Sequence, residues 1–266
     1  MWPRRQQAGQ RPLSLEVLSQ QLKALLTGLS IPQAALVGFS LGGMINRRCA
    51  IDHHDSVSAL MISNAPHERD PKAQRLVEER AAQTGEGGAS ATTEATLDRW
   101  FPSRFRETHT ETVDKIRSWV LANDPDSYTK HRQVLATGVV ALIRPNPART
   151  APYLIIACEN ESGSTPQMAQ AIAGEINGSE ILIVPDPQHL GLIEQTALFS
   201  TAIYDLLTRV LHTTGQQRTN KNDNNDRRAS SYRGAKNRKL GPCVWTDWVR
   251  HHGNFRRPRD QFYRHP

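Results

Sequence analysis

The stretch AALVGFSLGGM, residues 34–44, decides which fold we expect. Its apolar half, residues 34–39, predicts a short strand that is buried on both faces. The glycine-rich half predicts a turn, and a helix is expected from about Met44 to Asp52. The sequence therefore predicts a strand, a sharp turn and a helix in direct succession.

The turn carries the pattern G-x-S-x-G at Gly38, Ser40 and Gly42. This pattern is typical of a very sharp strand-to-helix turn, which holds the serine at its tip in strained backbone with its hydroxyl exposed. We expect glycine at 38, 42 and 43 because a Cβ at these positions would collide with the neighbouring strand and helix. The helix N-terminus beneath Ser40 would direct N–H donors and a positive dipole end at a reacting oxygen. The alternative is a simple glycine turn with an inert serine.

An amphipathic helix is predicted before this strand. Ser14 is suited to be its N-cap, and Gly28 and Pro32 mark its end. Leucines at helical spacing predict one buried face, formed by Leu15, Leu18, Leu22, Leu25, Leu26 and Leu29.

Three more apolar runs predict strands: residues 59–63 (ALMIS), 153–158 (YLIIAC) and 180–184 (EILIV). Helices are predicted at 165–176 and 192–211. Strands that alternate with helices indicate an α/β fold with a parallel sheet of about four strands. We expect this domain to span residues 13–211.

Residues 66–146 lie between the second and third predicted strands and are too many for a loop. The segment is polar and mostly helical, and we expect it to be an inserted cap. Its helices are predicted at 75–84, 93–101, 110–122 and 126–140.

The positive charge is concentrated near the C-terminal end. The formal net charge of the chain is +7, but residues 212–266 hold 13 Lys and Arg against 4 Asp and Glu, which leaves residues 1–211 slightly negative. We expect residues 1–12 and 212–266 to be disordered because neither segment shows apolar periodicity. A basic tail with scattered aromatic side chains could instead tether nucleic acid or an acidic membrane. Residues 212–266 contain no RNP-like motif, no Cys and His spacing typical of a zinc site, and no amphipathic helix pattern. We therefore expect no nucleic-acid partner.

The three cysteines, Cys49, Cys158 and Cys243, are widely spaced and form no C-x-x-C pair. Their odd number and spacing argue against a disulfide framework and against a zinc site. We expect a reducing, cytoplasmic compartment, with Cys49 and Cys158 as small core residues. No run of about 18 apolar residues predicts a membrane span, and we expect no secretory signal.

A nucleophilic serine needs a base, and the base needs an orienting carboxylate. In a parallel sheet both should follow later strands, at the carboxyl ends where α/β sheets place their sites. His189 follows residues 180–184 and is the candidate base, the alternative being a surface histidine in a loop. His53 and His54 lie at the far end of the helix after Ser40, and we assign them no chemistry.

The candidate acid lies after residues 153–158. Glu161 is our choice, Glu159 is its rival, and Asp186 is a weaker alternative. The chain order serine, acid, histidine is the one expected for a nucleophile in a strand-to-helix turn.

These residues and their surroundings resemble the α/β-hydrolase superfamily, and more narrowly the 3-oxoadipate enol-lactonases and related esterases. GFSLGG (38–43) is common throughout the superfamily, whereas RWFPSRF (99–105) and ESGSTP (161–166) are more selective for this branch. The resemblance covers about Leu13 to Leu211. It implies a nucleophile, an acid, a base and a backbone oxyanion donor at Ser40, Glu161, His189 and Leu41 respectively.

The chain departs from the family pattern in three ways. The family normally has Asp where this chain has Glu161, which is one methylene longer, and residues after about His212 match nothing in the family. The family's N-terminal strands, and the HG motif whose N–H is one oxyanion donor, have no counterpart here, so Leu41 is the one donor we predict. Loss of one donor in a comparable site costs about 10²–10³ in rate. Residues 34–39 would then form an exposed apolar sheet edge, through which we expect self-association.

The resemblance implies hydrolysis of a small carboxylic ester or lactone without a metal or organic cofactor. Two alternatives stay open: a perhydrolase of the same fold, and a truncated hydrolase remnant that is impaired or inactive. Arg99 or Arg104 could meet a substrate carboxylate, as an enol-lactone acid would require.

Overall fold

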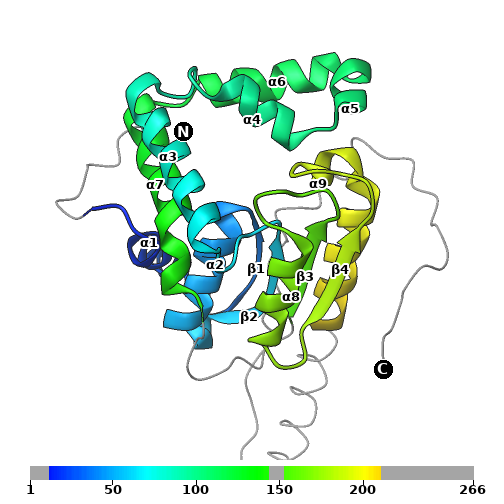
Figure 1. Cartoon of the computed structure of the whole chain (residues 1–266). Coiled ribbons are helices and arrows are strands. Elements are labelled where there is room, and N and C mark those ends of the chain that lie inside the picture. Colours follow the sequence, from blue (N-terminus) through cyan, green and yellow to red (C-terminus); the bar gives the residue numbers. More distant parts are fainter. Residues whose placement is uncertain (1–11, 144–152, 211–266) are drawn as a thin grey trace, which may run out of the picture. The chain divides into compact units, whose positions relative to one another are not determined.

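The computed structural model describes residues 12–143 and 153–210 (Figure 1). Its four strands form one parallel sheet in the order β1-β2-β3-β4. The predicted α/β fold class and four-stranded parallel sheet are confirmed. The tail predicted at 212–266 lies outside the described residues, as does the N-terminal segment apart from Pro12. The strands are β1 (Ala34–Phe39), β2 (Val57–Ser63), β3 (Tyr153–Cys158) and β4 (Glu180–Val184).

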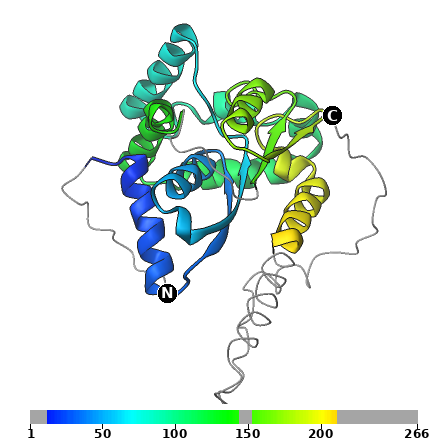
Figure 2. The ribbon, with the colours of Figure 1, turned by 90° about the horizontal axis from the view of Figure 1, so that it is seen from below.

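Helices cover both faces of the sheet (Figure 2). On β3, alternate residues point to opposite faces, as the twofold side-chain period of a strand requires. Ile155 packs toward Cys49 of α2 (Leu41–Asp52) and Ile172 of α8 (Pro166–Gly174). Ile156, on the other face, packs with apolar side chains of the helical residues 196–210. This burial on both faces explains why β3 is a continuous apolar run.

The first helix, α1, spans Leu15–Gly28, and the Ser14 side chain caps it by accepting a hydrogen bond from Val17 N at 3.3 Å. The predicted cap is therefore confirmed, but the predicted buried face is only partly right. Leu15 and Leu26 are buried, whereas Leu25 and Leu29 are 47% and 60% exposed. The apolar stripe of α1 is wider than the surface that covers it.

The helix after the G-x-S-x-G turn begins at Leu41 and not near Met44 as predicted. Gly42 and Gly43 lower the helix propensity of this segment, which is why the pattern alone placed the start too late. Tertiary packing overrides that weak preference, because Met44 is fully buried beside Leu15 and Leu142. A short 3-10 helix, η1 (His54–Ser56), leads from α2 into β2.

The chain between β2 and β3 is helical over residues 71–141, within the segment 66–146 that we expected to be a cap. Asp70 and Asp124 cap α3 and α7 with their carboxylates, each directly before a proline at the first helical position. Figure 1 shows α3 and α7 side by side, with α4, α5 and α6 lying across the end of the sheet. Sequence patterns missed α5. The elements are α3 (Pro71–Gly87), α4 (Thr93–Trp100), α5 (Ser103–Thr108), α6 (Thr110–Leu121), α7 (Pro125–Thr137) and η2 (Gly138–Ala141).

The helix predicted at 192–211 is interrupted in the structure. A short α9 (Gly191–Glu194) ends at Gln195, and residues 196–210 are helical. Among the described helices, none combines the length and the apolar character that a membrane crossing needs.

β1 lies at one edge of the described sheet, where it pairs with β2 alone. Val37, in the middle of β1, is 47% exposed. The exposed apolar edge predicted at residues 34–39 is therefore present in the described part of the chain.

Candidate active site

Ser40 occupies the tip of the turn between β1 and α2. Its backbone has φ 52° and ψ −120°, a conformation that non-glycine residues rarely adopt. The turn is fixed on both sides, because Ser40 N donates to Ser63 O at 2.8 Å and Ser40 O accepts from Met44 N at 3.2 Å. The strained strand-to-helix turn predicted at Ser40 is thus seen in the structure.

The glycines of this turn have different roles. A Cβ on Gly38 would lie 2.6 Å from both Gly42 O and Asn46 Nδ2, and one on Gly43 would lie 2.9 Å from the Cβ of Ala65. These two positions exclude a side chain, as predicted. The prediction is wrong for Gly42, where an added Cβ would meet nothing within 4 Å, because that side of the helix faces open space.

Glu161 and His189 meet at the carboxyl ends of β3 and β4. His189 Nδ1 and Glu161 Oε2 are 2.5 Å apart, and both side chains are almost fully buried. The second oxygen, Oε1, accepts from Gly163 N at 2.5 Å and Ser164 N at 3.1 Å. When Nδ1 donates to the carboxylate, the other ring nitrogen Nε2 keeps its lone pair, which is the arrangement of a general base.

The local contacts also set the charge of Glu161. Burial by itself raises the pKa of this carboxyl group, but the hydrogen bond and charge of His189, the Gly163 N–H and the charge of Arg99 act in the other direction. The balance holds the pKa of Glu161 below its ordinary value, so the group is ionised near neutral pH.

The loop of His189 is held from several sides. Phe39 and Trp100 flank the imidazole, with ring centroids 4.8 and 5.9 Å away. Leu190 N donates to Trp100 O at 3.1 Å, which joins this loop to the end of α4. Gly191 has no room for a side chain, because a Cβ there would overlap Cys158 Sγ.

The rival acids lie elsewhere. Glu159 is exposed and accepts from Asp186 N at 3.1 Å, so these two residues tie the two loops together. Neither carboxylate contacts His189 among the described interactions. His54 lies in η1, after the far end of α2, with its Nε2 3.1 Å from Asp55 Oδ1.

Asn64 is a site residue that sequence patterns missed. It follows β2 with a positive φ of 44° and is buried. Its Nδ2 donates to His189 O at 2.7 Å, and its Oδ1 accepts from Cys158 N at 2.9 Å. A polar residue directly after a parallel strand was the one available signal. Cys158 is fully buried as predicted, and burial raises the pKa of its thiol to about 11.

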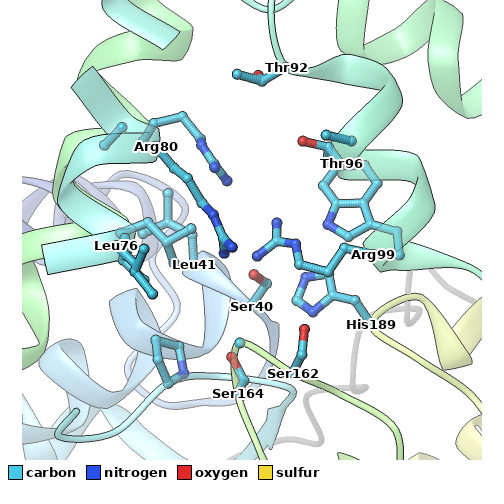
Figure 3. Close-up of a pocket in the computed structure, with 18 of the residues that line it drawn as sticks. Ser40, Leu41, Leu76, Arg80, Thr92, Thr96, Arg99, Ser162, Ser164 and His189 are labelled. Atoms are coloured by element: carbon cyan, nitrogen blue, oxygen red, sulfur yellow. The ribbon is translucent and has the colours of Figure 1, made fainter. Parts of the chain in front are cut away.

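A cavity of about 830 Å³ lies between the sheet end and the helical insertion, and Ser40, Leu41, Glu161 and His189 all line it. Figure 3 shows the Ser40 hydroxyl and the His189 ring facing the same space. No hydrogen bond joins the two side chains among the described contacts. Catalytic hydrogen bonds are often long before substrate binds, so this separation is compatible with proton transfer.

Leu41 is the first residue of α2. Its N–H is one of the donors that a helix N-terminus leaves without an intrahelical acceptor. Because Leu41 also lines the cavity, a donor stands next to Ser40 on the positive end of the helix dipole.

Four of the described arginines line the cavity, and together they are called the arginine wall. Arg99 is among them, whereas Arg104 is not, which decides between the two arginines singled out from the sequence. Sequence patterns missed the others, Arg69, Arg80 and Arg132. Within residues 12–143 and 153–210, no three His, Cys, Asp or Glu side chains are grouped so as to hold a metal ion.

The comparisons agree with this fold. A model of the alpha/beta hydrolase fold family matches residues 6–196, and the chain belongs to this family. The chain is similar to 3-oxoadipate enol-lactonase 2 of Acinetobacter baylyi, with 26% identity over 199 residues that cover 74% of this chain and 72% of the relative.

Solved structures show the same fold. The enol-lactonase from Burkholderia xenovorans superposes with a TM-score of 0.67 at 23% identity, covering 76% of each chain. A thermophilic esterase from Thermogutta terrifontis superposes with a TM-score of 0.66 at 23% identity, covering 75% of this chain and 74% of the esterase.

Proposed function

We propose that this protein is a serine hydrolase that cleaves a carboxylic ester or a lactone. The observation that carries the proposal is the convergence of Ser40, in its strained turn, with the hydrogen-bonded pair Glu161–His189 on one cavity. The similarity to an enol-lactonase supports the same type of substrate.

In the proposed reaction the Ser40 Oγ attacks the substrate carbonyl and gives up its proton to His189 Nε2. Glu161 stabilises the resulting imidazolium through Nδ1. The C–O bond to the leaving group then breaks, and the leaving oxygen takes the proton from Nε2. Water attacks the acyl-serine while His189 accepts a proton from it; the bond between the acyl carbon and Ser40 Oγ then breaks, His189 returns the proton to Oγ, and the acid product leaves.

The negative charge on the carbonyl oxygen needs hydrogen-bond donors during both steps. We propose that Leu41 N–H is one of them, because it lies at the N-terminus of α2 beside the nucleophile. A fixed donor of this kind contributes about 10²–10³ to the rate of related acyl transfers.

Hydrolysis of p-nitrophenyl acetate by the full chain tests the proposal. Ser40→Ala should lower kcat/KM at least about 10³-fold, because it removes the atom that forms the acyl intermediate. Ser118→Ala is the matched control, since Ser118 is exposed on α6 and away from the cavity. A folded wild-type chain without hydrolysis above background would favour the inactive remnant instead.

A cytoplasmic location is part of the same proposal. Cys49 and Cys158 are free and buried, which suits a reducing compartment.

A further inference from the structure

The arginine wall of the cavity contains two arginines that have no acidic partner among the described residues. Arg99 comes from α4 and Arg132 from α7, and both line the cavity. Among the described side chains, neither has a carboxylate within 4.0 Å. A charged side chain in a partly buried site is normally paired, so two unpaired guanidinium groups on one wall need an explanation.

The acids that line the same cavity form no ion pair with these two arginines, although the charge of Glu161 acts on Arg99. Asp98 pairs with Arg106, at 2.5 Å, and Glu161 is bound to His189 and to two backbone N–H groups. Gly163 lies beside both Glu161 and Arg99. A Cβ on Gly163 would lie 3.2 Å from Glu161 Oε1 and 3.3 Å from Arg99 Nη1. Arg99 is therefore near the carboxylate but outside ion-pair distance.

Donors on this wall are also left without acceptors. The Nε atoms of Arg132 and Arg69 are buried and have no hydrogen-bond partner in the described part of the chain. An unsatisfied buried donor typically costs about 1–3 kcal/mol, so these two Nε atoms add to the cost of the unpaired guanidinium groups.

Like charges on this wall act on one another. Burial lowers the pKa of Arg99, and the positive charge of Arg132 lowers it further, while Glu161 opposes the effect and Arg80 adds to it. Figure 3 shows Arg80 and Arg99 directed into the space above Ser40. This part of the site holds guanidinium groups close together at a cost in stability, which is common where a site is built for binding.

We infer that this wall binds a dianionic part of the substrate, with Arg99 and Arg132 as the main contacts. The inference rests on the proposed hydrolase function and specifies its substrate class: an ester or lactone whose acid or alcohol portion carries two negative charges. Two carboxylates or one phosphate group would meet this requirement, because both match the planar donor fork of arginine. Apolar side chains such as Leu76, Val77 and Met168 line the rest of the cavity and suit a short hydrocarbon part between this anion and the carbonyl group.

Calorimetric titration of the full chain with succinate and butyrate tests the inference without requiring turnover. The two compounds have the same number of carbon atoms, but succinate is a dianion near neutral pH and butyrate a monoanion. Succinate should bind at least about tenfold more tightly, and its affinity should fall when salt is raised. Titration with inorganic phosphate shows which kind of dianion the substrate carries. If phosphate binds more tightly than succinate, the substrate carries a phosphate group. If succinate binds more tightly, the substrate carries two carboxylates.

Variants connect the binding to the two arginines. Arg99→Gln and Arg132→Gln should each weaken succinate or phosphate binding about tenfold, while Arg104→Gln, which alters an exposed arginine outside the cavity, should leave it unchanged. Arg132→Lys keeps the charge but loses the fork, and should give an intermediate affinity.

Thermal unfolding separates binding from folding. Arg132→Gln should unfold at the same temperature as the wild type or higher, because it removes like-charge repulsion with Arg99. Equal affinity for succinate and butyrate, or equal weakening by Arg104→Gln, would overturn the inference. Such a result would leave the serine hydrolase proposal standing, since that is tested by reaction at Ser40.

Discussion

Ser40 shows how one residue depends on its neighbours for an unfavourable backbone conformation. Its positive φ costs roughly 1–3 kcal/mol and persists because the surrounding structure fixes it. The hydrogen bond from Ser40 N to Ser63 O fixes one side of the turn, and the absence of a side chain on Gly38 permits its close approach to Gly42. A serine hydroxyl at the tip is thereby held toward the cavity and away from the sheet.

Gly38 and Gly42 give a matched pair of substitutions at this turn. Gly38→Ala should lower the free energy of unfolding by about 1–3 kcal/mol, because its Cβ would lie 2.6 Å from the backbone oxygen of Gly42. Gly42→Ala meets open space inside a helix and should be neutral or stabilise by up to about 1 kcal/mol. Chemical denaturation measures both. Equal effects of the two substitutions would contradict the packing described for the turn.

Glu161 predicts a specific dependence of stability on pH. Its pKa in the folded chain lies below the ordinary value of 4.5, so its stabilising contribution is complete above that value and is lost as the pH falls through the lowered pKa. The gap in melting temperature between the wild type and Glu161→Gln should therefore narrow as the pH is lowered from 7 toward 3. A gap that stays constant over this range would show that the carboxylate charge does not stabilise the fold.

At the scale of elements, the ends of three strands are linked by one side chain. Asn64 follows β2, contacts the end of β3 through Cys158, and holds the loop after β4 through His189 O. This arrangement makes Asn64 a positioning residue for the proposed base, since it touches the backbone of His189 and not its ring.

Asn64→Ala should lower the free energy of unfolding by about 2–4 kcal/mol, because it leaves buried donors and acceptors unpaired. It should also reduce kcat more than it changes KM, since the displaced loop carries His189. Asn160→Ala is the control: Asn160 is exposed and bonds Asp186 O in the neighbouring loop, and its loss should cost under about 1 kcal/mol. Similar losses for both variants would argue that Asn64 has no special role.

The elements differ in how well the sequence predicts them. β3 and β4 have the predicted bounds, and for β3 the reason is that its continuous apolar run is buried on both faces. The start of α2 and the short α5 were missed, since packing and not helix propensity determines them. The same distinction applies to the site. Chain order and strand ends predicted Glu161 and His189, and the resemblance pointed to Arg99, whereas the other arginines of the wall come from helices whose relative placement no local pattern encodes.

At the scale of the whole molecule, the exposed edge of β1 has a consequence for assembly. An unpaired apolar edge strand is a template for pairing with another chain, and Val37 presents its side chain at that edge. We therefore expect the purified chain to associate with a second copy through β1.

Val37→Lys should shift the protein to a smaller species in gel filtration with light scattering, because a charge at the edge opposes strand pairing. Val140→Lys places the same charge on η2, where the valine is 76% exposed, and should leave the elution unchanged. A wild-type chain that elutes as a monomer at all concentrations would contradict the expected association.

The most direct test of the central claim is covalent labelling of the folded full chain with a fluorophosphonate. The probe phosphonylates a serine only when a base activates the hydroxyl and donors stabilise the developing charge. We predict one adduct, located at Ser40 by peptide mapping, that disappears in Ser40→Ala and is strongly reduced in His189→Ala. A folded wild-type chain that remains unlabelled, or that is labelled at another serine, would contradict the proposal that Ser40 is the nucleophile.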